Sequence, residues 1–462
     1  MRILNTKWNS NSLNERRRIM NLKKILLSML WLPLLTGCSD DENNVPSAQT
    51  GVGKGNEYVI YEANPKVFAT SGALNAITNR LDEILSLGTD ILWLMPVYEQ
   101  GVENAIGSPY CVKDYRKINS DYGTLEDLKT LVAQAHGKGM RVILDWVANH
   151  TSWDNVWIAN KSWYTQDADG NIISPEGMGW ADVADLNYDN QDMRQAMQDA
   201  MVYWITEADV DGFRCDYAEG VPLDFWATAI DALRQLKGDD LLMLAEGSDA
   251  SLYSAGFDCV YGWSFAQTLQ DVFAGSSTVA NLYDVHKSEY RQVPAGKFRL
   301  RYSTNHDLAS ERSPLQAYGG ARGAMAAFVL ASMMDGMPLI YSSQEIGYEQ
   351  PLSFFGYRIM DWNANMDYQN EYKTLMDIYK KTADLRGGEL KCYPTGKVAS
   401  LYWKNAEKGL FVVVNTSQDA ETVKTPIERA SETMKDLVSG ETLTLGVTMT
   451  LEPCQYMILE KE

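Results

Sequence analysis

The chain is short of positive charge. Its 462 residues hold 41 Lys and Arg against 61 Asp and Glu, which gives a formal net charge of -20 and an isoelectric point near 4.7. Nucleic-acid affinity depends on clustered Lys and Arg that neutralise phosphates. The deficit therefore argues against a nucleic acid as partner and favours a neutral or cationic substrate.

Cysteine is also scarce. The six cysteines are scattered without the close spacing of a zinc site or of a small disulfide framework, so neither is predicted. They are Cys38, Cys111, Cys215, Cys259, Cys392 and Cys454. Apart from Cys38, which belongs to the leader described next, we expect them to be buried single thiols.

The N-terminal segment 1–38 is interpreted as a leader. From Met20 a basic start precedes an apolar stretch that is too short and wrongly flanked for a membrane-spanning helix. The sequence LTGC that ends at Cys38 resembles a bacterial lipobox, and the acidic SDDE after it resembles the surface-export signal of Bacteroidetes lipoproteins. The resemblance implies lipidation at Cys38 and a place in the outer membrane, on the cell surface or alternatively on its periplasmic face. A free cysteine in an unprocessed leader is the other interpretation, and residues 39–56 are expected to be a tether.

Beyond the tether, short apolar runs alternate with amphipathic stretches. Eight such runs between residues 57 and 386 predict a parallel (β/α)8 barrel of the TIM type, an α/β fold. The predicted strands are Tyr58–Tyr61, Ile91–Met95, Arg141–Trp146, Asp211–Arg214, Leu241–Ala245, Asp258–Tyr261, Arg299–Ser303 and Pro338–Tyr341. The predicted helices include Leu125–Lys138, Met193–Glu207, Pro222–Leu236 and Gly320–Met334.

Two segments depart from this alternation. After the third strand, residues of about 150–190 lack helical periodicity and hold four tryptophans, so we expect a small inserted domain over the barrel mouth. Packing of this insert and stacking against substrate are both open for Trp153, Trp157, Trp163 and Trp180. From residue 387 to 462 short alternating strands predict a C-terminal antiparallel β-sandwich.

Acidic residues follow three of the predicted strands. Asp216, Glu246 and Asp307 each end an apolar or mixed run, and carboxylates are costly to bury unless they are paired. Because the carboxyl ends of barrel strands meet at one mouth, we expect these acids to converge into an active site. The residues Asp145, Arg214 and His306 occupy similar strand ends and should join them.

The order of these motifs resembles the α-amylase family of glycoside hydrolases, family 13. The motifs DWVANH (145–150), GFRCD (212–216), the strand end at Glu246 and TNHD (304–307) are similar to its four signature regions. ADLNYDN in the insert and GMPLIYSSQEIG (336–347) resemble two further regions. The similarity spans almost everything from Tyr58 to the C-terminus.

The resemblance implies a role for each site residue. Retaining cleavage of a glycosidic bond needs a nucleophilic carboxylate and a protonated acid about 5 Å apart. Asp216 would be the nucleophile, Glu246 the acid and then base, and Asp307 a stabiliser of the transition state. Arg214 lies two residues from Asp216, on the same side of its strand, and should keep it ionised. Of the four histidines, His150 and His306 would contact sugar hydroxyls, and Tyr110 would stack on the sugar.

Three details are left open by the sequence. Asp145 would either touch the sugar or support Arg214. Asn149 and Asp185 match calcium ligands of many family members, so a structural calcium and a plain loop-ordering role are both open, although the chemistry itself requires no cofactor. Where many members have a Lys-His pair, this chain has Glu219 and Gly220, which puts the contacts on the leaving-group side in doubt.

The predicted function is retaining hydrolysis of α-1,4 bonds in starch or maltooligosaccharides. Within the family the alternatives are an exo-acting α-glucosidase, a cyclodextrin hydrolase or a transglycosylase. Outside it, the alternatives are an inactive glycan-binding barrel and a membrane-anchored assembly component. The expected partners are an α-glucan, the membrane through Cys38, and other surface glycan-uptake proteins.

Overall fold

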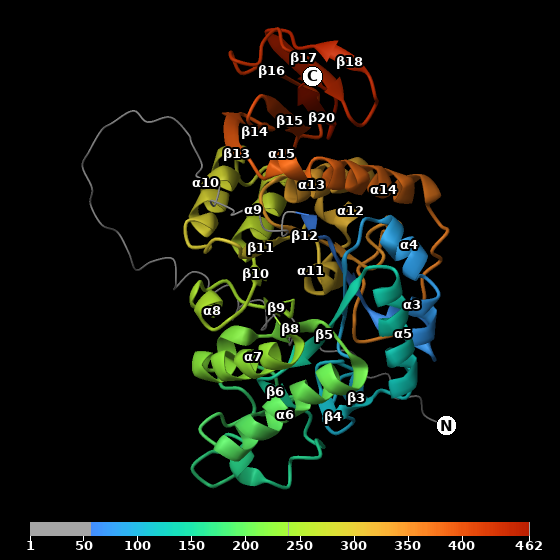
Figure 1. Ribbon diagram of the computed structural model, residues 1–462, viewed down its shortest axis with the longest axis vertical. Coiled ribbons are helices and arrows are strands. Elements are labelled where there is room, and N and C mark those ends of the chain that lie inside the picture. The colour runs from blue at the N-terminus through green and yellow to red at the C-terminus, as the bar shows by residue number, and fades with distance from the viewer. Residues whose placement is uncertain (1–56, 239, 462) are drawn as a thin grey trace, which may run out of the picture.

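The computed structural model describes residues 57–238 and 240–461. Its centre is a closed barrel of eight parallel strands with the order β1-β12-β11-β10-β9-β8-β5-β2 (Figure 1). The strands are β1 (Ile60–Ala63), β2 (Ile91–Leu94), β5 (Arg141–Val147), β8 (Gly212–Asp216), β9 (Leu242–Ala245), β10 (Cys259–Tyr261), β11 (Phe298–Arg301) and β12 (Met337–Tyr341). The predicted fold class is confirmed, and each predicted strand overlaps one strand of the barrel.

The barrel strands are buried on both sides, which is why they appear in the sequence as short apolar runs without alternation. Side chains such as Ile60, Trp93, Ile143 and Leu300 form a cluster of their own inside the barrel. Their sequence neighbours, among them Leu92, join the larger core between the strands and the outer helices. The interior is therefore packed, and open space for a ligand has to lie at one end of the barrel.

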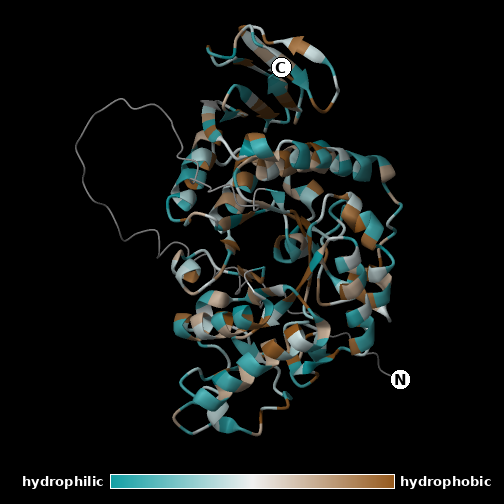
Figure 2. Cartoon of the chain, in the orientation of Figure 1, coloured by the Kyte–Doolittle hydropathy of each residue, from teal (hydrophilic) through white to brown (hydrophobic). Residues whose placement is uncertain are grey.

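Helices surround the barrel and pack one side against it. The major ones are α5 (Leu125–Gly137), α6 (Gln191–Ala208), α7 (Leu223–Lys237), α9 (Trp263–Phe273), α10 (Val279–Tyr290), α13 (Ala321–Met333) and α14 (Met366–Lys381). Shorter helices are α2 (Pro65–Phe68), α3 (Ala73–Thr78), α4 (Leu81–Ser86), α8 (Ser251–Ser254), α11 (His306–Glu311), α12 (Pro314–Ala317) and α15 (Ala383–Arg386). Helices α6 and α7 carry both hydrophilic and hydrophobic residues in Figure 2, as expected for helices with one buried side.

The segment between β5 and α6 contains little regular structure. A two-stranded sheet pairs β6 (His150–Thr151) with β7 (Ala184–Asp185), and a 3-10 turn covers Lys161–Trp163. A second small sheet, β3 (Tyr98–Gln100) with β4 (Val112–Ile118), precedes α5. The insert after the third strand is thus present, and it packs against residues that precede the strand.

The C-terminal part is antiparallel. A six-stranded sheet, in the order β13-β14-β15-β20-β17-β18, faces a two-stranded sheet of β16 and β19 across a shared apolar core. Its strands are β13 (Glu389–Thr395), β14 (Val398–Asn405), β15 (Lys408–Asn415), β16 (Glu421–Lys424), β17 (Thr433–Asp436), β18 (Thr442–Thr444), β19 (Thr448–Leu451) and β20 (Tyr456–Lys461). On β14, Tyr402 faces this core while Leu401 and Trp403 join the larger core that lies between the barrel strands and the outer helices. Figure 1 shows the sandwich beside α13 and α15, against the outer ring of helices.

Several sequence predictions concern residues outside the described ranges. The leader, Cys38 and the tether all lie there, so the structure does not bear on them. Cys111, Cys215, Cys259, Cys392 and Cys454 are buried, as predicted. Within the described residues, no helix combines the length and the apolar character that crossing a bilayer requires.

Candidate active site

Arg214 is the centre of the candidate site. It lies on β8 with no exposed surface, and its Nη1 is 2.8 Å from Asp145 Oδ1 and 2.8 Å from Asp216 Oδ1. Its Nη2 is 3.0 Å from Glu246 Oε2, an ion pair whose angle is not that of a hydrogen bond. One guanidinium therefore gathers three carboxylates from β5, β8 and the end of β9, as the sequence predicted for these strand ends.

Asp145 supports Arg214 and is itself fully buried. One of its oxygens accepts from Arg214, and the other accepts from Trp93 Nε1 at 3.1 Å and from the Tyr110 hydroxyl at 3.1 Å. Because both oxygens are occupied by protein donors, the geometry favours the supporting role over direct contact with a substrate. Tyr261 completes this layer by accepting from Arg214 Nε at 3.2 Å.

The two candidate catalytic carboxyls differ in their proton affinity. Burial raises the pKa of Asp216 to about 6, although Arg214 favours its charged form. Burial also raises the pKa of Glu246, to about 7, and the neighbouring Asp216 and Asp307 carboxylates contribute to that rise. At neutral pH Asp216 is therefore ionised in most molecules while Glu246 holds a proton in a larger share of them, and a nucleophile and a general acid need such a difference.

His306 carries a charge because two acids flank it. Its Nδ1 lies 2.5 Å from Glu62 Oε1, and its Nε2 lies 2.9 Å from the Tyr110 hydroxyl and 3.5 Å from Asp307 Oδ1. Burial lowers the pKa of His306, but the Asp307 and Glu62 carboxylates outweigh burial and raise it to about 9. At neutral pH His306 thus carries a proton on both ring nitrogens, of which Nδ1 faces Glu62 while Nε2 faces Tyr110 and Asp307.

The remaining predicted residues surround this cluster. Tyr110 stacks on the His306 ring with centroids 5.6 Å apart, so one face of the Tyr110 ring is turned toward His306. Asp307 stands at the start of α11 with a side chain 51% exposed, the most open of the three predicted acids. His150 lies in β6, and burial lowers its pKa to about 4, so it is neutral. All eight predicted site residues thus belong to the same region, at the carboxyl ends of the strands.

The segment after β8 hydrogen-bonds to Glu246 and to the loop that follows it. The backbone N–H of Tyr217 donates to Glu246 Oε2 at 2.7 Å. Glu219, which stands where many α-amylases have lysine, accepts from the backbone N–H groups of Ser248 at 2.6 Å and Asp249 at 2.9 Å. Its side chain is used to hold the acid loop.

Comparison with known proteins decides the family. The model of the α-amylase catalytic domain matches residues 41–171 and 178–389. The chain belongs to the α-amylase family. An α-amylase from Lactobacillus plantarum has the same fold, with a TM-score of 0.80 and 29% identity, over 88% of this chain and 99% of that one.

Two curated α-amylases are similar in sequence. That of Haloarcula japonica is 28% identical over 410 residues, which is 83% of this chain and 58% of that protein. Alpha-amylase 3 of Dictyoglomus thermophilum is 28% identical over 332 residues, which is 63% of this chain and 64% of that protein. The chain therefore spans less than two thirds of the length of these two relatives.

Asn149 and Asp185 are the candidate ligands for a structural calcium ion. Asn149 and Asp185 both lie beside His150, which follows Asn149 in sequence and pairs with Asp185 between β6 and β7. Among the described residues, no group of three or more His, Cys, Asp or Glu side chains could hold a metal. Two side chains fall short of the six to eight oxygen ligands that Ca²⁺ takes.

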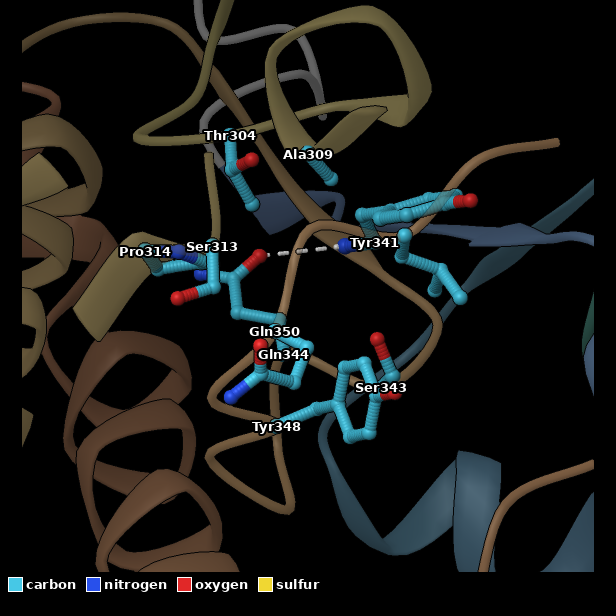
Figure 3. Close-up of a pocket in the computed structure, with 10 residues that line it drawn as sticks. Thr304, Ala309, Ser313, Pro314, Tyr341, Ser343, Gln344, Tyr348 and Gln350 are labelled. Carbon is cyan, nitrogen blue, oxygen red and sulfur yellow. Dashed lines mark hydrogen bonds between the residues drawn. The ribbon is translucent and has the colours of Figure 1, made fainter. Parts of the chain in front are cut away.

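A separate small pocket lies at the exit of β12. It is lined by Thr304, Ala309, Ser313, Pro314, Tyr341, Ser343, Gln344, Tyr348, Gln350 and Leu352 (Figure 3). Its volume of about 10 Å³ suits a water molecule at most, so it is no sugar site. Gln344 closes it by bonding Tyr341 N, Ser303 Oγ and the Tyr372 hydroxyl, which fixes the start of the loop between β12 and α14.

Sequence reasoning missed three residues of this site. Trp93 and Tyr261 are aromatic residues in apolar runs, so no feature of the sequence separates them from the core. Glu62 carried a usable signal, since it is an acid next to an apolar strand in YVIYEA. The sequence predicts that this strand ends at Tyr61, whereas β1 covers Ile60–Ala63, so Glu62 lies within the barrel wall.

Proposed function

We propose that this protein is a retaining α-glucan hydrolase that cleaves α-1,4-glucosidic bonds of starch or maltooligosaccharides. Asp216 attacks the anomeric carbon while Glu246 gives its proton to the leaving oxygen, so that a glycosyl ester forms on Asp216. Glu246, now ionised, then takes a proton from water, which attacks the same carbon and releases Asp216. Asp216 and the water attack opposite faces of the anomeric carbon, one after the other, so the configuration at that carbon is retained.

The electrostatics of the cluster support this assignment. Arg214 balances the charge on Asp216 before the attack and lies within 3.0 Å of Glu246, so it stabilises that carboxylate once its proton has left. The protonated His306 and the exposed Asp307 stand beside each other at the mouth, where they would bind sugar hydroxyls. The positive charge that develops on the sugar ring is favoured by the nearby acids.

One observation carries the proposal: a single buried guanidinium pairs with two carboxyls whose pKa values, about 6 and about 7, suit a nucleophile and an acid. An inactive barrel would be expected to lose one of these groups. The test is hydrolysis of maltotetraose followed by proton NMR, in which the first product should be the α anomer. A β anomer as first product would refute retention, and no turnover of any α-glucan by folded protein would refute the activity.

A second candidate is exo action at the non-reducing end of the glucan. It is supported by two loops that touch on the side of the barrel opposite Glu246 and form a wall there. Lys66, in α2 directly after β1, donates through Nζ to Gly107 O at 2.7 Å and to Phe355 O at 3.1 Å. These carbonyls belong to the loop before β4 and the loop after β12. Gly107 has φ +85°, and a Cβ there would stand 2.9 Å from Phe355 O, so the two loops touch.

The barrel order shows which side of the site this wall faces. β9, which Glu246 directly follows, is diametrically opposite β1 in the closed barrel. Since the acid protonates the leaving group, the opposite side holds the sugar that stays on the enzyme. Phe354, next to Phe355, packs edge-on against Tyr110 and His306, with centroids 5.7 Å and 5.2 Å apart. A wall there would leave little room for further sugars.

The two candidates differ on a blocked substrate. A nitrophenyl maltoheptaoside whose non-reducing end is capped should be cleaved by an endo-acting enzyme and spared by an exo-acting one, whereas the uncapped glycoside is cleaved by both. Products from amylose, pullulan, cyclodextrin and maltose then separate chain length and linkage. Equal rates on the capped and uncapped glycosides would reject exo action.

Membrane attachment through Cys38 is proposed from the sequence alone. The segment 20–42 supports an outer membrane lipoprotein, facing the cell surface, that would work beside other glycan-uptake proteins. Cys38→Ala should lose palmitate labelling and move the protein from the membrane fraction to the soluble one. If the label and the location are unchanged, Cys38 is not the anchor.

A further inference from the structure

Two aromatic rings near the acid belong to no hydrophobic core. Trp180 and Tyr217 are half-buried, yet the three apolar clusters of the described residues include neither of them. The other tryptophans of the insert, Trp153, Trp157 and Trp163, all pack against the main cluster. Core packing therefore accounts for three of these four tryptophans and leaves Trp180 without a packing role.

Trp180 and Tyr217 contact each other across the mouth. Their ring centroids lie 5.2 Å apart in an edge-to-face arrangement, and the Trp180 ring also lies 5.5 Å from the His150 ring. The Tyr217 hydroxyl reaches the sulfur of Met178 at 3.7 Å. The insert thus contributes Trp180 and Met178, and the turn after β8 contributes Tyr217, to one apolar surface.

This surface lies on the side of the acid. Tyr217 follows Asp216 directly, and its backbone N–H is the donor to Glu246 Oε2. The acid gives its proton to the leaving oxygen, so the next sugar of the substrate must extend past Glu246 on this side. Glu219, at the position where a lysine would contact that sugar in many α-amylases, is instead turned to the backbone of Ser248 and Asp249.

The backbone at Tyr217 is held in an uncommon conformation. Its φ of +41° lies in the left-handed region, which a bulky residue rarely adopts. The ring passes over Gly220, where an added Cβ would come within 2.2 Å of Tyr217 Cε1. Such conformations persist where surrounding contacts enforce them, and they cluster at ligand sites.

We propose that Trp180 and Tyr217 form the binding surface for the leaving-group sugar, so that their rings replace the lysine contact of other family members. The ligand is an uncharged pyranose, whose apolar C–H face can cover an aromatic ring. This inference rests on the proposed function. It adds that substrates with a sugar on the leaving side are preferred over those with a small leaving group.

Two substrates separate the new surface from the chemistry. Maltotetraose places a sugar on the leaving side, whereas α-maltosyl fluoride has only a fluoride there and uses the same nucleophile. Trp180→Ala should lower kcat/KM for maltotetraose about tenfold more than kcat/KM for the fluoride, which corresponds to about 1.4 kcal/mol. Trp180→Phe keeps a ring and should restore most of the preference.

The matched control is Trp163→Phe, which changes a tryptophan of the same insert that packs edge-on against Trp157, 5.5 Å away. It should keep the wild-type ratio between the two substrates. Calorimetry with maltotetraose in an Asp216→Asn background gives a readout without turnover, and Kd should rise about tenfold when Trp180→Ala is added. Circular dichroism verifies that each variant is folded.

The outcomes distinguish this inference from the proposed function. If wild-type protein hydrolyses both substrates and Trp180→Ala lowers both rates by the same factor, the leaving-side surface is wrong and the hydrolase remains. An unchanged Kd in the Asp216→Asn background would also overturn it. If folded wild-type protein hydrolyses neither substrate, the proposed function itself fails.

Discussion

Glu62→Gln removes the buried charge that keeps His306 protonated. The carboxylate lies 2.5 Å from His306 Nδ1, and with Asp307 it raises the pKa of His306 to about 9 against the effect of burial. Glutamine has nearly the same shape but no charge. With one acid gone, we expect the His306 pKa to fall to about 6.5, which corresponds to about 3 kcal/mol of lost preference for the charged ring.

The small number of histidines makes this change measurable. With four histidines in the chain, NMR of histidine-labelled protein can follow each ring separately. His306 should stay charged up to about pH 9 in the wild type, and in Glu62→Gln it should titrate between about pH 6 and 7. At pH 8 the variant ring has lost one donor, so kcat/KM should fall roughly tenfold.

The matched control is Glu345→Gln. Glu345 is also buried, and burial raises its pKa, but its Oε1 accepts from the Tyr61 hydroxyl at 2.7 Å instead of contacting a histidine. The His306 titration should be unchanged in this variant. A His306 ring that is still charged at pH 8 in Glu62→Gln would refute the assigned role of Glu62.

The same pair makes stability depend on pH. Since the folded pKa of His306 is above its unfolded value of about 6.5, its contribution is fully present below pH 6.5 and is lost as the pH rises through about 9. The urea midpoint of the wild type should therefore fall across this window. Glu62→Gln should show a smaller fall.

Three further predictions concern the carboxylates and their supports. The pH profile of kcat/KM should be bell-shaped and narrow. It should rise near pH 6 as Asp216 ionises and fall near pH 7 as Glu246 loses its proton. A profile that is flat from pH 5 to 9 would contradict the assignment of these two carboxyls. Arg214→Met leaves three acids without their buried cation, so urea unfolding at pH 7 should show a loss of about 3–5 kcal/mol, and an equally stable variant would speak against the pairing. Glu219→Gln keeps an oxygen that can accept from the backbone N–H groups of Ser248 and Asp249, so it should lower kcat less than Glu219→Ala does. KM should change little in both variants. Equal losses of kcat in the two variants would contradict a positioning role for Glu219.

Much of the site could be predicted because its acids interrupt apolar runs. Asp216 is the last residue of β8 and Glu246 directly follows β9, and all residues of both strands are buried, so the two charges stand out against the apolar pattern. The pairing of Arg214 with Asp216 followed from the two-residue period of a strand, and both do point to the same cluster. The barrel itself followed from the alternation of runs and amphipathic stretches.

The missing parts depend on contacts between distant residues. Glu62 and His306 are separated by 244 positions, and their closeness arises only because β1 and β11 are two places apart in the closed barrel. The position of Trp180 outside the hydrophobic clusters is likewise invisible in the sequence, because the four tryptophans of the insert cannot be told apart until their neighbours are known. The role of Asp145 is open in the sequence for the same reason, since its second oxygen accepts from Trp93 and Tyr110, which are distant along the chain.

The most direct test of the account is to trap the glycosyl ester. Incubation with 5-fluoro-α-glucosyl fluoride should inactivate the protein, and mass spectrometry of its peptides should find the sugar on Asp216. The Asp216→Asn variant should remain unlabelled. A label on another acid, or full inactivation of Asp216→Asn with the sugar attached elsewhere, would contradict the assignment of the nucleophile and with it the proposed mechanism.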